Sequence, residues 1–252
     1  MANLSGISRE SLFGKLLRVP LRLIPRSLAM PILQGPLQGK KWIVGSGNHG
    51  CWLGSYEYDK QRLFQRTVRP GDVVYDIGAN AGFYSLLASV LVGAEGHVYS
   101  FEPLPENIRN IRKHLKINRV QNCTLNEVAV SSCDGEALFD PSADRCTSHL
   151  STTGSIKVRT VTLNTLLARK EIRPPDLMKI DIEGAEYDCL QGCDAIIQAF
   201  RPLIFLATHG QAIHDACLKL LTDWNYRVES MDARPVQSSD ELIAQPGSRP
   251  EH

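Results

Sequence analysis

The feature that most constrains the fold is a regular alternation of short apolar segments and longer amphipathic segments between residues 73 and 232. The apolar segments are typical of strands and occupy residues 73–78, 97–103, 123–130, 176–182, 202–209 and 226–232. Helical periodicity is found between them, at residues 83–93, 105–118, 186–200, where a break is expected near Gly192, and 212–224. This alternation is typical of βαβ units, so we predict an α/β fold with a doubly wound, largely parallel sheet.

The flanking regions are less regular. Residues 1–58 are interrupted by prolines and glycines, and we expect an irregular or helical segment that acts as a lid over a cofactor or substrate. A main domain is expected at residues 59–245, followed by a mobile tail at 246–252. Within the domain, two weaker β segments, 136–140 and 155–163, flank a polar loop, and short helices are expected at 60–68 and 165–170.

The composition excludes several classes of protein. The formal net charge of the 252 residues is +1, so we expect no nucleic-acid partner. No apolar run reaches the ~18 residues of a membrane helix, so no stable membrane insertion is expected. The N-terminal stretch LFGKLLRVPLRLIPRSLAMPIL mixes leucines with basic residues; it either touches a membrane surface or, as is more usual, packs on its own domain. The 7 cysteines form no Cys-x-x-Cys motif, so we expect reduced thiols and a cytoplasmic protein.

The first predicted strand ends in a glycine loop, DIGANAG, which runs from Asp76 to Gly82. A dinucleotide-binding loop has a second glycine two residues after the first, but here Asn80 follows Gly78 at that spacing. The carboxylate of Asp76 at the root of the loop disfavours a pyrophosphate and favours a cationic ligand, such as the ammonium of S-adenosylmethionine. A purely structural turn is the alternative.

Glu102 ends the second predicted strand, in VYSFEP. An acidic side chain at this position is suited to accept hydrogen bonds from both ribose hydroxyls of an adenosine ligand. Nicotinamide cofactors use the same residue, so Glu102 indicates adenosine without identifying the reaction. An exposed glutamate in a turn is the alternative.

Four ordered motifs resemble the FkbM-type methyltransferase family. They are DIGANAGFYS, FEPLPENIRNIRKHLKIN, EVAVSSCDGEALF and MKIDIEGAEYDCLQG, and the resemblance covers roughly residues 55–230. It implies a Rossmann-like class I methyltransferase fold, whose seven-stranded, mostly parallel sheet has an antiparallel last strand. It also implies S-adenosylmethionine as the methyl donor, and most members of the family methylate oxygen atoms of sugars or natural products.

The resemblance assigns residues to a cofactor pocket. By position, the pocket corresponds to Asp76, Gly78, Asn80, Gly82, Glu102 and, at the end of the fourth strand, Asp181. The stretch 127–130 is expected beside the adenine, which adds Glu127, Ala129 and Val130. Upstream, GSYE resembles the family's segment before the first strand, so Tyr56 and Glu57 are expected to close over the cofactor.

Methyl transfer to a hydroxyl is a direct displacement, and a nearby group must remove the hydroxyl proton or lower its pKa. The candidates follow the fourth and fifth strands and are Asp181, Glu183, Glu186, Thr208 and His209. We predict His209 as the base, because an imidazole titrates near neutral pH, and Asp181 as its orienting or acceptor-binding partner. The alternatives are a histidine hydrogen-bonded into a loop and an aspartate that caps the turn at Gly184.

One position departs from the family pattern. The family often has a glutamate two residues before the histidine, whereas this chain has Ala207. A mechanism that requires this glutamate is therefore in doubt. Mg²⁺ held by Asp181 and another carboxylate is a further alternative, but we assign no metal ligands.

The remaining polar residues near the strand ends receive milder interpretations. Glu183 and Glu186 begin a helix, where negative charge is favourable, so we expect Glu186 to be structural or to contact the methionine ammonium. Lys179 alternates with Asp181 along the strand, so both point to one face of the sheet, and we expect a structural ion pair with Asp181 or Glu183.

Two further groups are weaker candidates. His49, Trp52 and Tyr56 either form an aromatic lid or simply pack together. In the polar loop 141–154, Arg145 and His149 either contact the acceptor or are solvated.

The leading hypothesis is an S-adenosylmethionine-dependent O-methyltransferase that acts on a small molecule or a glycan. N-methylation and a macromolecular acceptor are alternatives within the same class, and a homodimer is left open. Alternatives from other classes are a nicotinamide-dependent oxidoreductase, which Asn80 disfavours, and a cofactor-binding protein without catalysis, which Ala207 keeps open.

Overall fold

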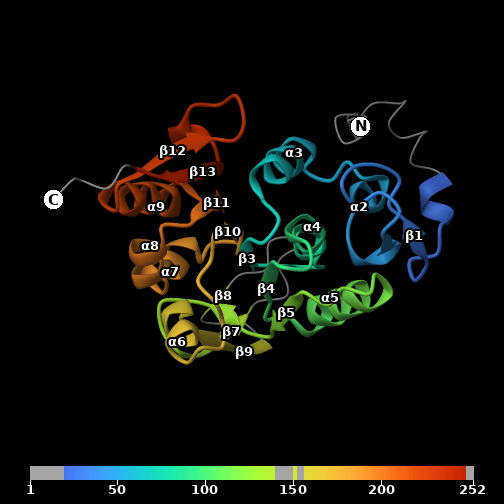
Figure 1. Cartoon of the computed structure of the whole chain (residues 1–252), viewed down its shortest axis with the longest axis horizontal. Helices are drawn as coiled ribbons and strands as arrows, with labels where there is room; N and C mark the ends of the chain where they lie inside the picture. Colours follow the sequence, from blue (N-terminus) through green and yellow to red (C-terminus); the bar gives the residue numbers. More distant parts are fainter. Residues whose placement is uncertain (1–19, 140–149, 152–155, 248–252) are drawn as a thin grey trace.

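The computed structural model describes residues 20–139, 150–151 and 156–247. A seven-stranded sheet in the order β12-β13-β11-β10-β3-β4-β5 organises the fold (Figure 1). The predicted α/β fold with a mostly parallel sheet is confirmed, since β13 alone runs opposite to the other six strands of this sheet. The strands are β3 (Val73–Ile77), β4 (His97–Phe101), β5 (Cys123–Asn126), β10 (Leu177–Ile180), β11 (Leu203–Ala207), β12 (Tyr226–Ser230) and β13 (Glu241–Pro246).

Helices cover both faces of this sheet because its strands are apolar on both sides. Along β3, Tyr75 and Ile77 face a core that includes residues of α6 to α9, whereas Val74 faces a core formed with α3 and α4. This division is the doubly wound arrangement that the alternating sequence predicts. The helices are α2 (His49–Leu53), α3 (Tyr58–Thr67), α4 (Phe83–Val92), α5 (Pro105–Ile117), α6 (Leu163–Ala168), α7 (Glu186–Gln191), α8 (Asp194–Phe200) and α9 (Gln211–Asp223).

The sequence predicts one strand at residues 123–130, but this prediction is wrong. The segment divides into β5 and the two-residue strand β6 (Ala129–Val130), which joins a separate sheet in the order β6-β9-β7-β8. The other strands of this sheet are β7 (Gly135–Phe139), β8 (Leu150–Ser151) and β9 (Ile156–Val161). The chain changes sheets between β5 and β6, so the end of the segment turns away from the main sheet.

β13 is a strand that periodicity does not predict. It lies between β11 and β12 and pairs antiparallel with both. The predicted mobile tail therefore begins too early, because Pro246 is paired with Tyr226. Residues 248–252 lie outside the described residues.

The described part of the N-terminal segment, residues 20–58, contributes to the domain core. It contains the 3-10 turns η2 (Pro20–Leu23) and η3 (Val44–Ser46), and a hairpin of β1 (Ala29–Pro31) and β2 (Lys41–Ile43). Trp42 is buried and stacks on His114 of α5, with ring centroids 3.8 Å apart. The Nδ1–H of His114 donates to the carbonyl of Ala81, and its Nε2 accepts from the amide of Ile43. Burial lowers the pKa of His114 to about 4, so the ring is neutral and joins the segment to the glycine loop.

The loops that follow β3 and β10 approach each other very closely. A methyl group on Gly78, whose φ is +76°, would lie 1.9 Å from the carbonyl oxygen of Asp181. Only glycine avoids both this contact and the unfavourable positive φ. Gly78 therefore allows Asp181 to lie directly beside the glycine loop.

We expect Gly78→Ala to destabilise the protein more than Gly71→Ala. Gly71 has a φ of +92° but open space around its Cα, so its replacement isolates the backbone strain of about 1–2 kcal/mol. Gly78→Ala adds the collision with Asp181, which we expect to cost roughly another 1–3 kcal/mol. Urea unfolding of the two variants measures the difference, and equal losses of stability would contradict the close approach.

Candidate active site

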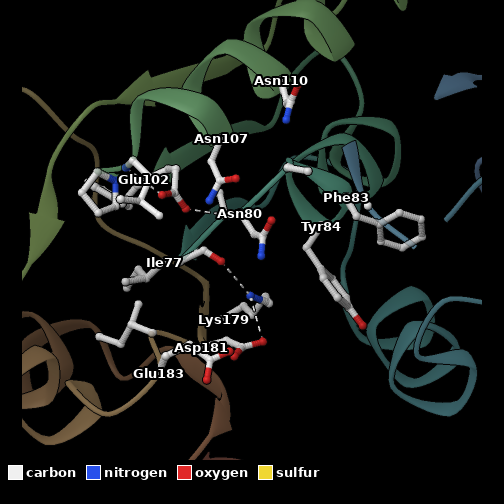
Figure 2. A pocket seen from close by; sticks show the side chains of 18 of the residues that line it. Ile77, Asn80, Phe83, Tyr84, Glu102, Asn107, Asn110, Lys179, Asp181 and Glu183 are labelled. Atoms are coloured by element: carbon white, nitrogen blue, oxygen red, sulfur yellow. Dashed lines mark hydrogen bonds and ion pairs between the residues drawn. The ribbon is translucent and has the colours of Figure 1, made fainter. Parts of the chain in front are cut away.

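A cavity of about 470 Å³ opens at the carboxyl ends of β3, β4, β10 and β11. This is the edge at which parallel α/β sheets bind their ligands. Most residues assigned from the sequence line it: Tyr56, Glu57, Gly78, Asn80, Glu102, Ala129, Val130, Asp181 and His209. Figure 2 shows the side chain of Asn80 between Glu102 on one side and Lys179 and Asp181 on the other.

Glu102 forms one end of the cavity. Its carboxylate is buried and accepts the backbone amides of Asn80, at 2.8 Å, and Leu104, at 2.9 Å. Burial raises the pKa of Glu102 to about 7, although these hydrogen bonds oppose the shift. The carboxylate is thus fixed in place by two loops at the cavity wall. Val128, Ala129 and Val130 add an apolar wall beside it, which suits a flat aromatic base.

Three residues of the assigned pocket do not line the cavity. Asp76 is buried beneath it, where its carboxylate accepts the Ser85 hydroxyl at 2.6 Å and lies 3.4 Å from the Lys179 ammonium. Gly82 has a left-handed conformation and forms the N-cap of α4. Glu127 pairs with Arg112 on the outer surface. The assignment of Asp76 to a ligand ammonium therefore lacks contact geometry, because the carboxylate is already paired inside the fold.

Two buried lysines hold Asp181 at the centre of the cavity. Its Oδ2 lies 3.5 Å from Lys179 Nζ and 3.6 Å from Lys60 Nζ, which confirms the expected ion pair of Lys179. Burial by itself would raise the pKa of Asp181, but the two ammonium groups and His209 outweigh it and hold this pKa below its usual range. Asp181 is consequently anionic and is a poor proton acceptor.

Lys60 connects Asp181 to the segment that precedes α3. Its ammonium lies 3.4 Å from Glu57 Oε2 and 2.8 Å from Glu241 Oε2. Burial would lower the pKa of Lys60, but Asp181, Glu57 and Glu241 raise it overall. Lys60 stays charged and fixes three carboxylates around one point. The sequence offers no signal for this role, because Lys60 lies in an ordinary amphipathic helix.

His209 is oriented by Glu186. The Nδ1–H of His209 donates to Glu186 Oε1 at 2.7 Å, and Glu186 also accepts the amide of Gly184 at 3.0 Å. Glu186 begins α7 as predicted. It is buried and does not line the cavity, so its contacts fit the structural one of its two expected roles. The pairing leaves Nε2 of His209 directed at Glu183, 3.2 Å away, and at Asp181, 4.0 Å away.

The carboxylates around His209 change its protonation. The hydrogen bond to Glu186 has the largest effect and, with Glu183 and Asp181, raises the pKa of His209 to about 9 despite burial. His209 is therefore an imidazolium at neutral pH when the cavity holds no ligand. Since this pKa is above its ordinary value, the charged imidazole stabilises the folded protein. This contribution to folding stability is complete below about pH 6.5 and is lost as the pH rises through about 9.

A carboxylate occupies the place opposite Ala207, where the family often has glutamate. Ala207 of β11 pairs with Glu241 of β13, and both residues line the cavity. An acidic group is thus present at this wall, but it comes from a neighbouring strand. The sequence could have suggested it only if β13 had been recognised.

Part of the backbone strain in the described residues lies at the cavity. Three of its residues that are not glycine have a positive φ: Glu57 at 43°, Asn80 at 50° and Glu183 at 55°. Such conformations cost of order 1–3 kcal/mol each and persist where the surroundings impose them, commonly at functional sites.

The weaker candidates are placed elsewhere. Thr208 is buried, and its hydroxyl lies 2.9 Å from His214 Nδ1 rather than in the cavity lining. Trp52 donates its indole N–H to His49 Nδ1 at 3.1 Å, and neither residue lines the cavity, so the packing alternative is correct for this pair. Arg145 and His149 lie outside the described residues.

Asp181, Glu183 and His209 also form a cluster that could hold a metal ion. One ligand atom from each lies within 4.8 Å of the others. Two carboxylate oxygens and one imidazole nitrogen suit a first-row transition metal better than Mg²⁺, which prefers oxygen ligands. The orientation of His209 by Glu186 resembles the carboxylate–histidine arrangement found behind metal ligands.

Comparisons with known proteins agree with this geometry. The model of the FkbM methyltransferase domain matches residues 76–228. The hexuronic acid methyltransferase AglP of Haloferax volcanii is 26% identical over 170 residues, which cover 66% of this chain and 68% of that protein. The 31-O-demethyl-FK506 methyltransferase FkbM of Streptomyces tacrolimicus is 29% identical over 160 residues, which cover 50% of this chain and 61% of that protein.

Solved structures share the fold. A methyltransferase FkbM from Methylobacillus flagellatus superposes with a TM-score of 0.51 at 14% identity, over 79% of this chain and 55% of that chain. A SAM-dependent O-methyltransferase from Thermotoga maritima gives a TM-score of 0.50 at 14% identity, over 77% of this chain and 66% of that chain. These likenesses establish the Rossmann-like methyltransferase fold. The domain match, which covers more than half of the chain, shows that this chain belongs to the FkbM methyltransferase family.

Proposed function

We propose that this protein transfers a methyl group from S-adenosylmethionine to a hydroxyl of a glycan or a small natural product. The observation that carries the proposal is that one cavity joins the fixed carboxylate of Glu102 to the Asp181–His209 cluster. The first group suits the ribose of an adenosine ligand, and the second suits an acceptor hydroxyl. The names of the sugar-modifying and FK506-modifying relatives support an oxygen acceptor.

The cavity residues have distinct roles in this proposal. Glu102 accepts the ribose hydroxyls, and Val128 to Val130 lie against the adenine. Tyr56 and Glu57 close the cavity from the N-terminal side, as both line it ahead of α3. S-adenosylmethionine supplies an electrophilic methyl group. What remains for the protein is to orient the acceptor and to take its proton.

His209 is the proposed proton acceptor, and Glu186 is its positioning residue. The imidazole must be neutral to act as a base, so the proton that it carries at neutral pH has to leave first. A cationic donor in the cavity favours that loss, because positive charge near an imidazolium lowers its pKa. Asp181, whose pKa is held low, remains an anionic acceptor for hydrogen bonds from the substrate.

A divalent ion on Asp181, Glu183 and His209 is the second candidate for activating the hydroxyl. The proximity of the three ligand atoms favours it. The ammonium groups of Lys60 and Lys179 beside Asp181 oppose it, because they already balance this carboxylate. We therefore favour the histidine base.

The setting of the reaction is also proposed. We expect a cytoplasmic enzyme, in keeping with the free cysteines of the described chain. No described helix has the length and apolarity needed to cross a membrane. An acceptor nitrogen, a macromolecular acceptor and a homodimer stay open, and a screen of labelled methyl transfer against glycans and hydroxylated metabolites tests the acceptor class.

Calorimetry with S-adenosylmethionine tests the donor. We expect Glu102→Gln to weaken binding by roughly 10-fold or more, because one buried oxygen can no longer accept a ribose hydroxyl. Glu127→Gln is the matched control and should bind normally, since Glu127 lies on Arg112 outside the cavity. Binding of NAD in place of S-adenosylmethionine would overturn the proposed function.

The pH dependence of turnover tests the base. We expect the rate to rise as the pH approaches about 9, because His209 then becomes neutral. If the bound donor lowers the pKa of His209, the same rise occurs at a lower pH. Glu186→Gln should move the rising limb to lower pH because it removes the largest cause of the raised pKa. His209→Ala should lose roughly 10²–10⁴-fold of the rate together with the limb. Full activity of His209→Ala would exclude the base.

Chelation separates the two candidates for activating the hydroxyl. We expect turnover to persist in excess EDTA, because the histidine route needs no metal. Loss of turnover in EDTA with recovery in Mn²⁺, and weaker recovery in Mg²⁺, would instead favour the metal cluster. Glu183→Gln is assayed in parallel. Its turnover should persist if His209 is the base, because only the metal route requires the Glu183 carboxylate.

A further inference from the structure

One face of the molecule carries an accumulation of unpaired positive charge. Helix α5 exposes a row of basic side chains, and the N-terminal segment adds more beside it. The six exposed cations, which we call the basic face, are Arg26, Lys41, Arg109, Lys113, Lys116 and Arg119. None of the six forms an ion pair with another residue in the described part of the chain.

The basic face differs from the opposite end of the molecule, around α9 and β12, and from the charge of the whole protein. Exposed cations at the other end of the molecule, such as Lys219 and Arg227, lie against a neighbouring carboxylate. The formal net charge of the chain is only +1. The positive charge of the basic face is therefore concentrated locally, which attracts anionic partners to this end of the molecule.

The elements of the basic face are held together rigidly. Asn118, which follows α5, accepts the amide of Lys41 at 2.7 Å and donates to its carbonyl at 2.9 Å. Behind them, Trp42 stacks on His114. Figure 1 shows α5 and β1 at one end of the molecule and α9 and β12 at the opposite end.

Exposed leucines occur in the N-terminal segment that carries Arg26 and Lys41. In the same N-terminal segment, Leu23 is 82% exposed, Leu33 50% and Leu28 44%. A single exposed leucine is ordinary, but here they make up three of the five large exposed apolar side chains recorded for the described residues. The sequence just before Pro20, LFGKLLRV, has the same mixture of leucines and basic residues.

The basic face adjoins the mouth of the cavity. Arg26 belongs to both, and α5 lends Glu106, Asn107 and Asn110 to the cavity lining while Arg109 and Lys113 point outward from the same helix. A partner that binds the basic face is thus held beside the entrance to the proposed active site.

We propose that the basic face and the exposed leucines dock this protein on the surface of a bilayer that contains anionic phospholipids. Clusters of four to eight Lys and Arg residues attract such surfaces, and leucines beside them insert into the interface. The protein binds the bilayer only at its surface, because there are few exposed leucines and the cations stay in the headgroup layer. The acceptor is then one that is presented at the bilayer, such as a glycan on a lipid anchor; this last step rests on the proposed function.

A lipid surface fits the basic face better than a nucleic acid does. A nucleic-acid site uses cations with exposed aromatic or polar side chains to contact bases, whereas the apolar side chains here are aliphatic.

Vesicle sedimentation with the full chain tests the proposal. We expect binding to vesicles of phosphatidylcholine with phosphatidylglycerol, and at least roughly tenfold weaker binding to phosphatidylcholine alone. Raising the salt from about 0.1 M to about 0.5 M should release most of the protein, because exposed charges are screened. Lys113→Glu with Lys116→Glu should weaken binding by roughly tenfold or more, and Leu23→Ser with Leu28→Ser should weaken it at both salt concentrations.

The matched control is Lys219→Glu with Arg227→Glu, which changes the net charge equally at the opposite end and should bind as the unaltered protein does. Melting curves and S-adenosylmethionine binding establish that each variant is folded, so failure of lipid binding is distinguishable from failure of the proposed function. Equal binding to both kinds of vesicle would overturn the proposal. So would equal losses in the two charge-reversal variants, or tight binding of a DNA duplex with no binding to vesicles.

Discussion

The buried pairing of Lys179 with Asp76 and Asp181 is the interaction on which the site depends. Lys179 and Asp76 are directly opposite each other on adjacent parallel strands, so a single ammonium joins the ends of β10 and β3. Removing one member of such a group leaves a buried charge without a partner, which typically costs several kcal/mol. Gly78 allows the two strand ends to meet, and Asp181 then takes its position in the cavity. Burying these charges lowers the folding stability that an apolar core would give, but it fixes the arrangement of charges at the proposed active site.

Local pattern was sufficient to predict most of the framework. The strands β3, β4, β10, β11 and β12 and the helices between them follow from apolar periodicity, because each is wholly local in origin. The rule that ligands bind at the carboxyl ends of parallel strands then placed Glu102, Asp181 and His209 at one cavity. Periodicity did not predict β13, because its register depends on two strands that are distant in sequence; only the family resemblance implied an antiparallel last strand. The division of residues 123–130 escaped prediction because an apolar run does not reveal which sheet it joins.

The residues of the site that the sequence did not reveal come from elements that only tertiary packing brings next to the strand ends. Glu186 meets His209 only because β10 and β11 are neighbours, and Glu241 reaches the cavity only through β13. Lys60 comes from a helix that precedes the first strand of the sheet. Asp76 was assigned to a ligand because its place in the loop suggested contact, whereas the pleat of β3 points its side chain into the core. Type and spacing of residues identify candidates, and only tertiary packing decides which of them meet.

The position of β13 has a consequence for how the protein matures. Glu241 belongs to the last strand of the sheet, yet that strand lies inside the sheet, between β11 and β12. On a ribosome, the earlier strands emerge first and leave the edge of β11 without a partner until residues 241–246 arrive. An open edge invites pairing with other chains, so this interval is when the nascent protein is most exposed to aggregation. The charge network around Lys60 also stays incomplete until then, so the cavity acquires the carboxylate of Glu241 only after residues 241–246 have been made.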